Sequence, residues 1–180
     1  NEVVRFMLED LDRAIELMMD KAPESGRLCK DAARLMKARV ALYEGTWEKY
    51  HAGTAFVPGN NKWPGSSIWP NYHFPAGSPE AEYHYFFEQA IAAADLVASN
   101  RSLNNDYISM FNNLGTFGDA DEVILARYYL EGVISHSASN YLGRTGAGTG
   151  FTRALANTFL MTNGLPIYDV QSTYQGDKVM

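Results

Sequence analysis

Cysteine, long apolar runs and clustered positive charge are all scarce in this sequence. Cys29 is the only cysteine, so an intrachain disulfide and a cage of several thiolates around a metal are excluded. No apolar run approaches the roughly 18 residues that a membrane-spanning helix needs. The net charge is -6 and no run of Lys or Arg occurs, so binding to nucleic acid lacks an electrostatic basis.

The common catalytic motifs are also missing. The glycines of GRTGAGTGF, residues 143–151, fit neither the phosphate-loop ending Gly-Lys-Ser/Thr nor the spacing of a dinucleotide-binding turn. No Gly-x-Ser-x-Gly elbow is present, and no serine can be assigned to a triad. His84 and Glu88 lie four residues apart, but two ligands do not make a metal site, and a surface hydrogen bond is the better interpretation.

An acidic turn is the remaining candidate for chemistry. Asp119, Asp121 and Glu122 lie in the stretch GDADE, whereas a glycosidase needs two carboxylates held at a fixed separation in a cleft. Such neighbours are more typical of a solvated turn. We therefore expect no enzyme and no cofactor, and the sequence leaves open whether a structural Ca²⁺ binds at this turn.

The composition nevertheless supports a real core. The chain has 180 residues, of which 46% are apolar and 20% charged, which fits one ordinary domain or part of a larger one. It opens in helical register without an initiator Met, so we expect an internal portion of a longer protein. Any signal segment or lipid anchor would then lie upstream.

Helical periodicity dominates two parts of the chain, residues 1–50 and 79–112, which we expect to form a helical scaffold. Residues 113–180 are expected to be rich in loops, with a strand over residues 122–129 because of its β-branched and aromatic content. A short helix is expected at TRALANTFLM, residues 152–161. In the first helix, the apolar stripe comprises Val4, Met7, Leu8, Leu11, Ile15 and Met18; in the second, it comprises Ala33, Met36, Val40, Tyr43 and Trp47.

A weak internal echo suggests how the helices pair. Met7, Leu11, Ala14 and Ile15 have the same spacing as Tyr83, Phe87, Ala90 and Ile91. A small residue after two large ones is typical of the second helix of a tetratricopeptide (TPR) hairpin, although any antiparallel helix pair favours alanine at its crossing point. The predicted fold class is mainly α, with TPR-like hairpins, long irregular loops and minor β-structure.

Residues 51–78 form an insertion between the helical parts, rich in proline and aromatic residues. Proline at this density forbids both a regular helix and a central strand. Aromatic rings can stack on the C–H-rich faces of sugars, while amides and imidazoles bind hydroxyl groups. The rings could instead fold inward as the loop's own small core. The candidate ligand-binding residues are Trp63, Trp69, Asn71, Tyr72, His73 and Phe74, with Asn60, Asn61 and Lys62 as further polar partners.

Four landmarks in order resemble the SusD/RagB family. The segment GRLCKDAARLMKARVALYEGTWEKYHAG is similar to the family's helix and following turn, and EYHYFFEQAIAAADLVASNRSLNNDYISMF to its helix, loop and Tyr-x-x-x-Phe step. DEVILARYY resembles the next strand, and GFTRALANTFLMTNGLPI the segment after it. The insertion is not part of the pattern that can be matched residue by residue.

The resemblance implies a function that the composition did not show. Family members are surface-exposed outer-membrane lipoproteins that bind glycans and act with SusC-like TonB-dependent transporters. We therefore expect non-catalytic binding of an oligosaccharide and its delivery to such a transporter, with the membrane reached only through an N-terminal lipid anchor outside this chain. The alternative is a docking component of a nutrient-uptake complex that binds peptides or proteins along TPR-like hairpins.

Overall fold

The computed structural model describes residues 2–22, 26–112, 122–127, 129, 133, 137, 141 and 150–176. The chain divides into two compact units, Asn1–Tyr128 and Tyr129–Met180, and each is described by itself. Most of the Gly/Ser-rich loop at 131–150, Asp119 and Asp121 lie outside the described residues, and so does most of the 143–151 glycine stretch.

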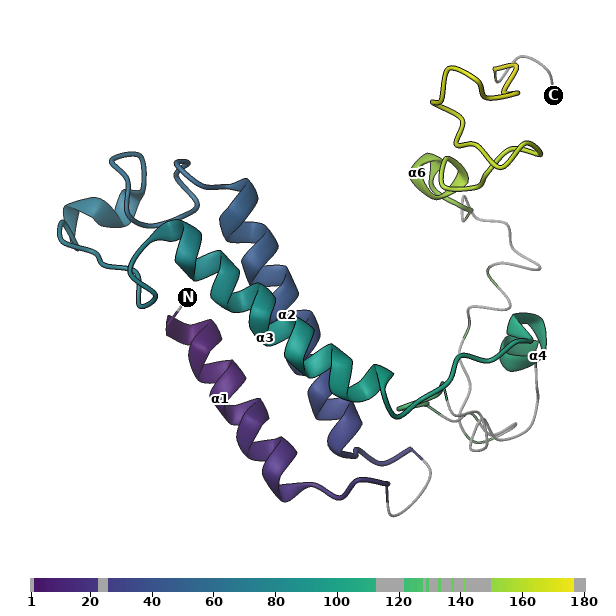
Figure 1. Cartoon of the computed structure of the whole chain (residues 1–180), viewed down its shortest axis with the longest axis horizontal. Coiled ribbons are helices and arrows are strands. Elements are labelled where there is room, and N and C mark those ends of the chain that lie inside the picture. Colours follow the sequence, from purple (N-terminus) through teal and green to yellow (C-terminus); the bar gives the residue numbers. More distant parts are fainter. Residues whose placement is uncertain are drawn as a thin grey trace. The chain divides into compact units, whose positions relative to one another are not determined.

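Three long helices form the first unit, and the mainly α prediction is confirmed. They are α1 (Glu2–Leu17), α2 (Lys30–Tyr50) and α3 (Pro79–Ala98). Successive helices run in opposite directions, and the insertion lies at the end of the helices where α1 begins (Figure 1). α2 packs against both α1 and α3. The TPR-like pairing of these hairpins stays a prediction.

Small residues let α2 approach its neighbours. Ala41 is fully buried in a cluster with Leu8 of α1 and with Phe86 and Ala90 of α3. Gly45 is also buried, and a Cβ there would lie 2.9 Å from the Phe87 ring. Alanine and glycine therefore lie where α2 crosses its neighbours, because only small side chains allow the backbones to come this close.

The expected large-residue stripe of α2 is wrong at two positions. Met36 is 51% exposed and Tyr43 is 67% exposed. The buried positions include instead Ala38, Ala41 and Gly45. The reason is that α2 has a neighbour on two sides, so its inward surface is wide and is filled by small residues rather than by one narrow apolar stripe.

Ion pairs connect segments that are distant in sequence. Lys37 of α2 is buried and donates from Nζ to both carboxylate oxygens of Asp12 in α1, at 2.6 and 2.8 Å. Asp31, also buried, accepts from Arg34 Nη1 at 3.0 Å and from Arg101 Nε at 2.8 Å. These buried charges are paired, as the high cost of desolvating a lone charge requires.

Two local expectations were wrong. Residues 122–127 form no strand in the part of the chain that is described; β propensity reports fit to a pleated surface, and no neighbouring strand is present there to pair with them. In the second unit, helix α6 covers only Arg153–Ala156 rather than the ten residues expected. The Thr158 hydroxyl donates to the Leu155 carbonyl, and such a bond from a side chain to the backbone competes with continuing the helix.

The helical part expected at residues 79–112 contains α3 and a second, short helix, α4 (Tyr107–Asn112). Ser78 caps α3, its hydroxyl accepting from the Ala81 N–H at 3.1 Å, with Pro79 at the first helical position. The Asn163-Gly164 turn forms with Gly164 at φ +77°, a conformation that glycine adopts without strain.

Glu44 of α2 gives a pH-dependent prediction. Burial raises the pKa of its carboxyl above the ordinary 4.5, and the negative charge of Glu82 raises it further. In the pH range between 4.5 and the raised value, the folded state binds more protons than the unfolded state, so stability falls as the pH rises through this window. We expect Glu44→Gln to flatten this slope in urea unfolding followed from pH 4 to 7. A slope that stays the same in the folded Glu44→Gln variant would contradict this assignment.

Candidate functional site

The amide of Asn60 closes the first half of the insertion. Its Nδ2 donates to the carbonyl oxygens of Thr54 at 2.9 Å and of Val57 at 2.7 Å, and its Oδ1 accepts from the Lys62 N–H at 2.9 Å. Val57, which is 2% exposed, packs beneath this turn. Asn60 is therefore a structural residue of the loop, since its amide already makes three hydrogen bonds.

A buried carboxylate fixes the other end of the insertion. Glu82, in the first turn of α3, is 0% exposed. Its Oε2 accepts from the Ala76 N–H at 2.8 Å, and its Oε1 accepts from Arg5 Nε of α1 at 2.9 Å. The Arg5 guanidinium also lies 3.9 Å from the centre of the Tyr85 ring. No sequence pattern pointed to this connection between α1, α3 and the insertion.

Aromatic rings pack together at the junction between α2 and the insertion. The His51 ring stacks on Trp47 with a centroid separation of 4.0 Å, and Phe56 meets both rings edge-on. The backbone N–H of His51 donates to the Trp47 carbonyl at 3.0 Å, and His51 Nδ1 lies 3.0 Å from the same oxygen. His51 therefore caps the end of α2, where a histidine also suits the helix dipole.

A row of aromatic rings crosses the second half of the insertion. Trp63 and Tyr72 are 5.5 Å apart between ring centroids, and Tyr72 meets Phe74 edge-on at 5.2 Å. Phe74 is only 8% exposed. A Cβ at Gly59 would lie 2.7 Å from the Phe74 ring, so this ring packs directly under the backbone. Phe74 is thus part of the loop's own core and not of an open binding surface.

An open cleft of about 360 Å³ lies on this aromatic row. Its size falls in the range of ordinary ligand sites. Trp69 is 65% exposed at its edge, whereas Trp63 is half-buried and packs against Gly65, where a Cβ would collide with its ring. The lining residues are Gly59, Asn60, Asn61, Trp63, Ser66, Trp69, Pro70 and Tyr72. Among them, Trp69 offers the most accessible ring surface.

The six candidate residues from the sequence therefore separate into three groups. Trp63, Trp69 and Tyr72 line the cleft together. Asn71 and His73 are exposed but are not among its lining residues, and Phe74 is buried. Burial of Phe74 fits the interpretation that rings fold inward as the loop's own core. Sugar contact by the rings that line the cleft stays a prediction.

The sequence offered little indication of two polar side chains that line the cleft. Asn61 is exposed and Ser66 is half-buried, and both line the cleft. Among the described residues, neither side chain has a hydrogen-bond partner, so each can bind a ligand hydroxyl without breaking an existing bond. Asn61 was named only as a further partner and Ser66 not at all; a serine that follows a Pro-Gly pair carries no sequence signal that separates binding from turn formation.

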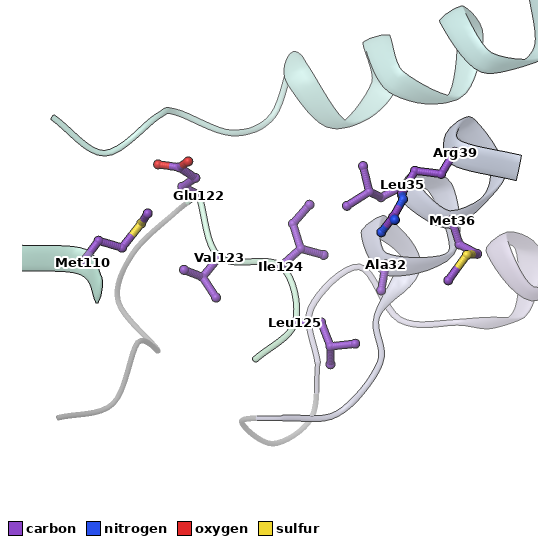
Figure 2. Close-up of a pocket in the computed structure, with 9 residues that line it drawn as sticks. All are labelled: Ala32, Leu35, Met36, Arg39, Met110, Glu122, Val123, Ile124 and Leu125. Atoms are coloured by element: carbon purple, nitrogen blue, oxygen red, sulfur yellow. The ribbon is translucent and has the colours of Figure 1, made fainter. Parts of the chain in front are cut away.

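A second cleft, of about 400 Å³, lies along the outer side of α2. Figure 2 shows Leu35, Met36 and Arg39 of α2 at one end and Met110 and Glu122 toward the other. Ala32 and the segment Val123–Leu125 complete a largely apolar lining. Glu122 Oε2 accepts from the Asn104 N–H at 2.7 Å. This cleft suits an apolar group better than a ligand rich in hydroxyls, which would find few partners there.

Metal-binding clusters and membrane-spanning helices are absent from the part of the chain that the structure describes. Within the described residues, no group of three or more His, Cys, Asp and Glu side chains could hold a metal ion; His84 and Glu88 are both exposed. No helix among those described is long and apolar enough to cross a bilayer. Compared with known proteins, the chain matches no family model, no curated protein and no solved structure.

Proposed function

We propose that the chain belongs to a non-catalytic glycan-binding protein, and that the cleft of the insertion contacts the sugar. The observation that carries this proposal is the exposed Trp69 ring beside Asn61 and Ser66, two polar side chains with free hydrogen-bonding capacity. A sugar presents an apolar C–H face and polar hydroxyl edges, and this pairing of ring and polar groups suits both.

The charge of the insertion supports binding over hydrolysis. Residues 51–78 contain no Asp or Glu, and the described residues that line the cleft include no carboxylate. Glycoside hydrolysis by the common mechanisms needs a pair of carboxyl groups flanking the bond. Stacking and hydrogen bonding alone would give reversible capture without a reaction.

The resemblance to the SusD/RagB family extends the proposal to a cellular role. In that role the chain would be part of a surface-exposed lipoprotein of the outer membrane, with a TPR-like helical scaffold. The bound oligosaccharide would pass to a SusC-like TonB-dependent transporter. The helical scaffold and the cleft in the insertion are compatible with this role. The transporter contact rests on the resemblance alone.

Trp69→Ala tests the proposed site. We expect about a tenfold loss of affinity for the bound oligosaccharide, since removing one stacking ring costs on the order of 1.4 kcal/mol. Calorimetric titration against a panel of oligosaccharides measures it. Ile68→Ala is the matched control, because Ile68 is the adjacent residue, is 74% exposed and does not line the cleft. Equal affinity of both folded variants would contradict the role of the cleft.

Peptide docking is the second candidate function, favoured by the apolar cleft on α2. Leu35 and Met36 are 40% and 51% exposed there, and Arg39 adds a positive charge. An extended peptide with apolar side chains would fit this lining better than a sugar would. Short peptides titrated beside the sugars separate the two functions: heats from peptides alone would favour docking.

A further inference from the structure

We propose that the cleft of the insertion selects neutral glycans and discriminates against those that carry carboxylate or sulfate groups. This inference rests on the proposed function, and it adds the chemical class of the ligand. Its basis is the charge and hydrogen-bonding state of the side chains around Trp69, rather than the presence of aromatic rings.

Among the residues that the structure describes, no charged side chain lines the cleft. The polar groups available to a ligand include the Asn61 amide and the Ser66 hydroxyl, which match neutral hydroxyl groups as both donors and acceptors. An anionic group that enters the cleft loses part of its hydration and needs a cation or several N–H donors in return. The Asn60 amide cannot serve, because its Nδ2 already donates to two carbonyl oxygens.

Lys62 is the one Lys or Arg between residues 51 and 78. It is exposed and is not among the lining residues, although its neighbours Asn61 and Trp63 are. A solvated lysine outside the cleft contributes a screened interaction at most. The net charge of -6 on the whole chain opposes any gain from this residue, since a negative field repels anions during approach.

The geometry also indicates how a neutral sugar binds. One side of the Trp63 ring is covered by Gly65, and Tyr72 packs against the ring at 5.5 Å. Trp69 is therefore the platform for the sugar face, with Trp63 and Tyr72 forming a wall. Asn61 and Ser66 then contact hydroxyls at the edge of the same sugar. A carboxylate in place of one of these hydroxyl-bearing groups would face neutral partners only.

The test is calorimetric titration of the whole chain with matched ligands. Oligogalacturonides and their methyl esters share one backbone and differ in charge, and neutral gluco-, manno- and xylo-oligosaccharides complete the panel. We expect a neutral ligand to bind at least tenfold more tightly than any acidic one at the same ionic strength. We also expect Ile68→Ala to leave that neutral affinity unchanged, and Trp69→Ala to lower it.

Different results would overturn the selection by charge and the binding of glycans itself. Acidic glycans that bind as tightly as neutral ones, with an affinity lost in Lys62→Ala, would overturn the charge selection and leave glycan capture standing. Absence of binding to every glycan by the folded wild-type chain would overturn both. Binding of a neutral glycan that Trp69→Ala does not weaken would place the ligand elsewhere and would also overturn the inference.

Discussion

Replacing Glu82 with alanine is expected to lower the free energy of unfolding by about 3–5 kcal/mol, the usual cost of removing one partner from a buried ion pair. The Glu82 side chain is fully buried, while Arg5 is 21% exposed. Loss of the Glu82 carboxylate leaves the Arg5 guanidinium and the Ala76 N–H without their acceptor. Both groups would then bear a desolvation cost, to which the lost packing of the side chain adds.

Urea unfolding followed by circular dichroism measures this effect. Glu80→Ala is the matched control, because Glu80 lies in the same first turn of α3 but is exposed; its replacement should cost well under 1 kcal/mol. Glu82→Ala should also free the end of the insertion at Ala76, so the affinity for a glycan should fall together with the stability. Equal stability of the Glu80 and Glu82 variants would contradict the role assigned to the buried carboxylate.

A double replacement distinguishes the ion pair from simple packing. Arg5→Met with Glu82→Met removes both charges and keeps much of the volume. Because two apolar groups can replace a buried pair at little cost, we expect this variant to be more stable than Glu82→Ala. The Ala76 N–H stays without its acceptor, so full recovery is not expected, and the insertion should still be loosened.

The sequence indicated the helices well because their signals are local. Ser78 caps α3, and apolar periodicity marks the helical segments. The buried side of α2 was harder to predict. Periodicity shows that a helix has an inward face, but it does not show how many neighbours share that face, and Ala41 and Gly45 lie against residues far away in the chain.

The candidate site was predicted in composition but not in arrangement. Tryptophan and tyrosine in a proline-rich insertion pointed to the segment that holds the cleft of about 360 Å³. Burial of Phe74 depends on its contact with Gly59. The path of the insertion also depends on the hydrogen bond from the Ala76 N–H to Glu82. The pairing of Glu82 with Arg5 spans 77 positions in the chain, and no local pattern carries such information.

The second large effect is expected at Phe86, and it tests the register of α3 directly. The internal echo in the sequence placed Phe87 and Ile91 on the important stripe together with Ala90. The structure buries Phe86 completely and Ala90 to 7% exposure, and leaves Ile91 60% exposed. Ala90 was therefore predicted on the right face, while the neighbouring large residue on that face is Phe86, four positions earlier.

Phe86→Ala should therefore lower the free energy of unfolding by about 3–5 kcal/mol, the range for removing a buried phenylalanine. The adjacent Phe87→Ala should cost about 1–2 kcal/mol, because the Phe87 ring is only half-buried and transfers less area from water. The cavity left by Phe86 would lie where Leu8 and Ala41 meet α3, and these helices cannot collapse into it without disturbing the Arg5–Glu82 pair nearby. Urea unfolding of the two variants provides the comparison. If Phe87→Ala proved the more costly change, Phe87 rather than Phe86 would lie on the inward face of α3, as the internal echo indicated.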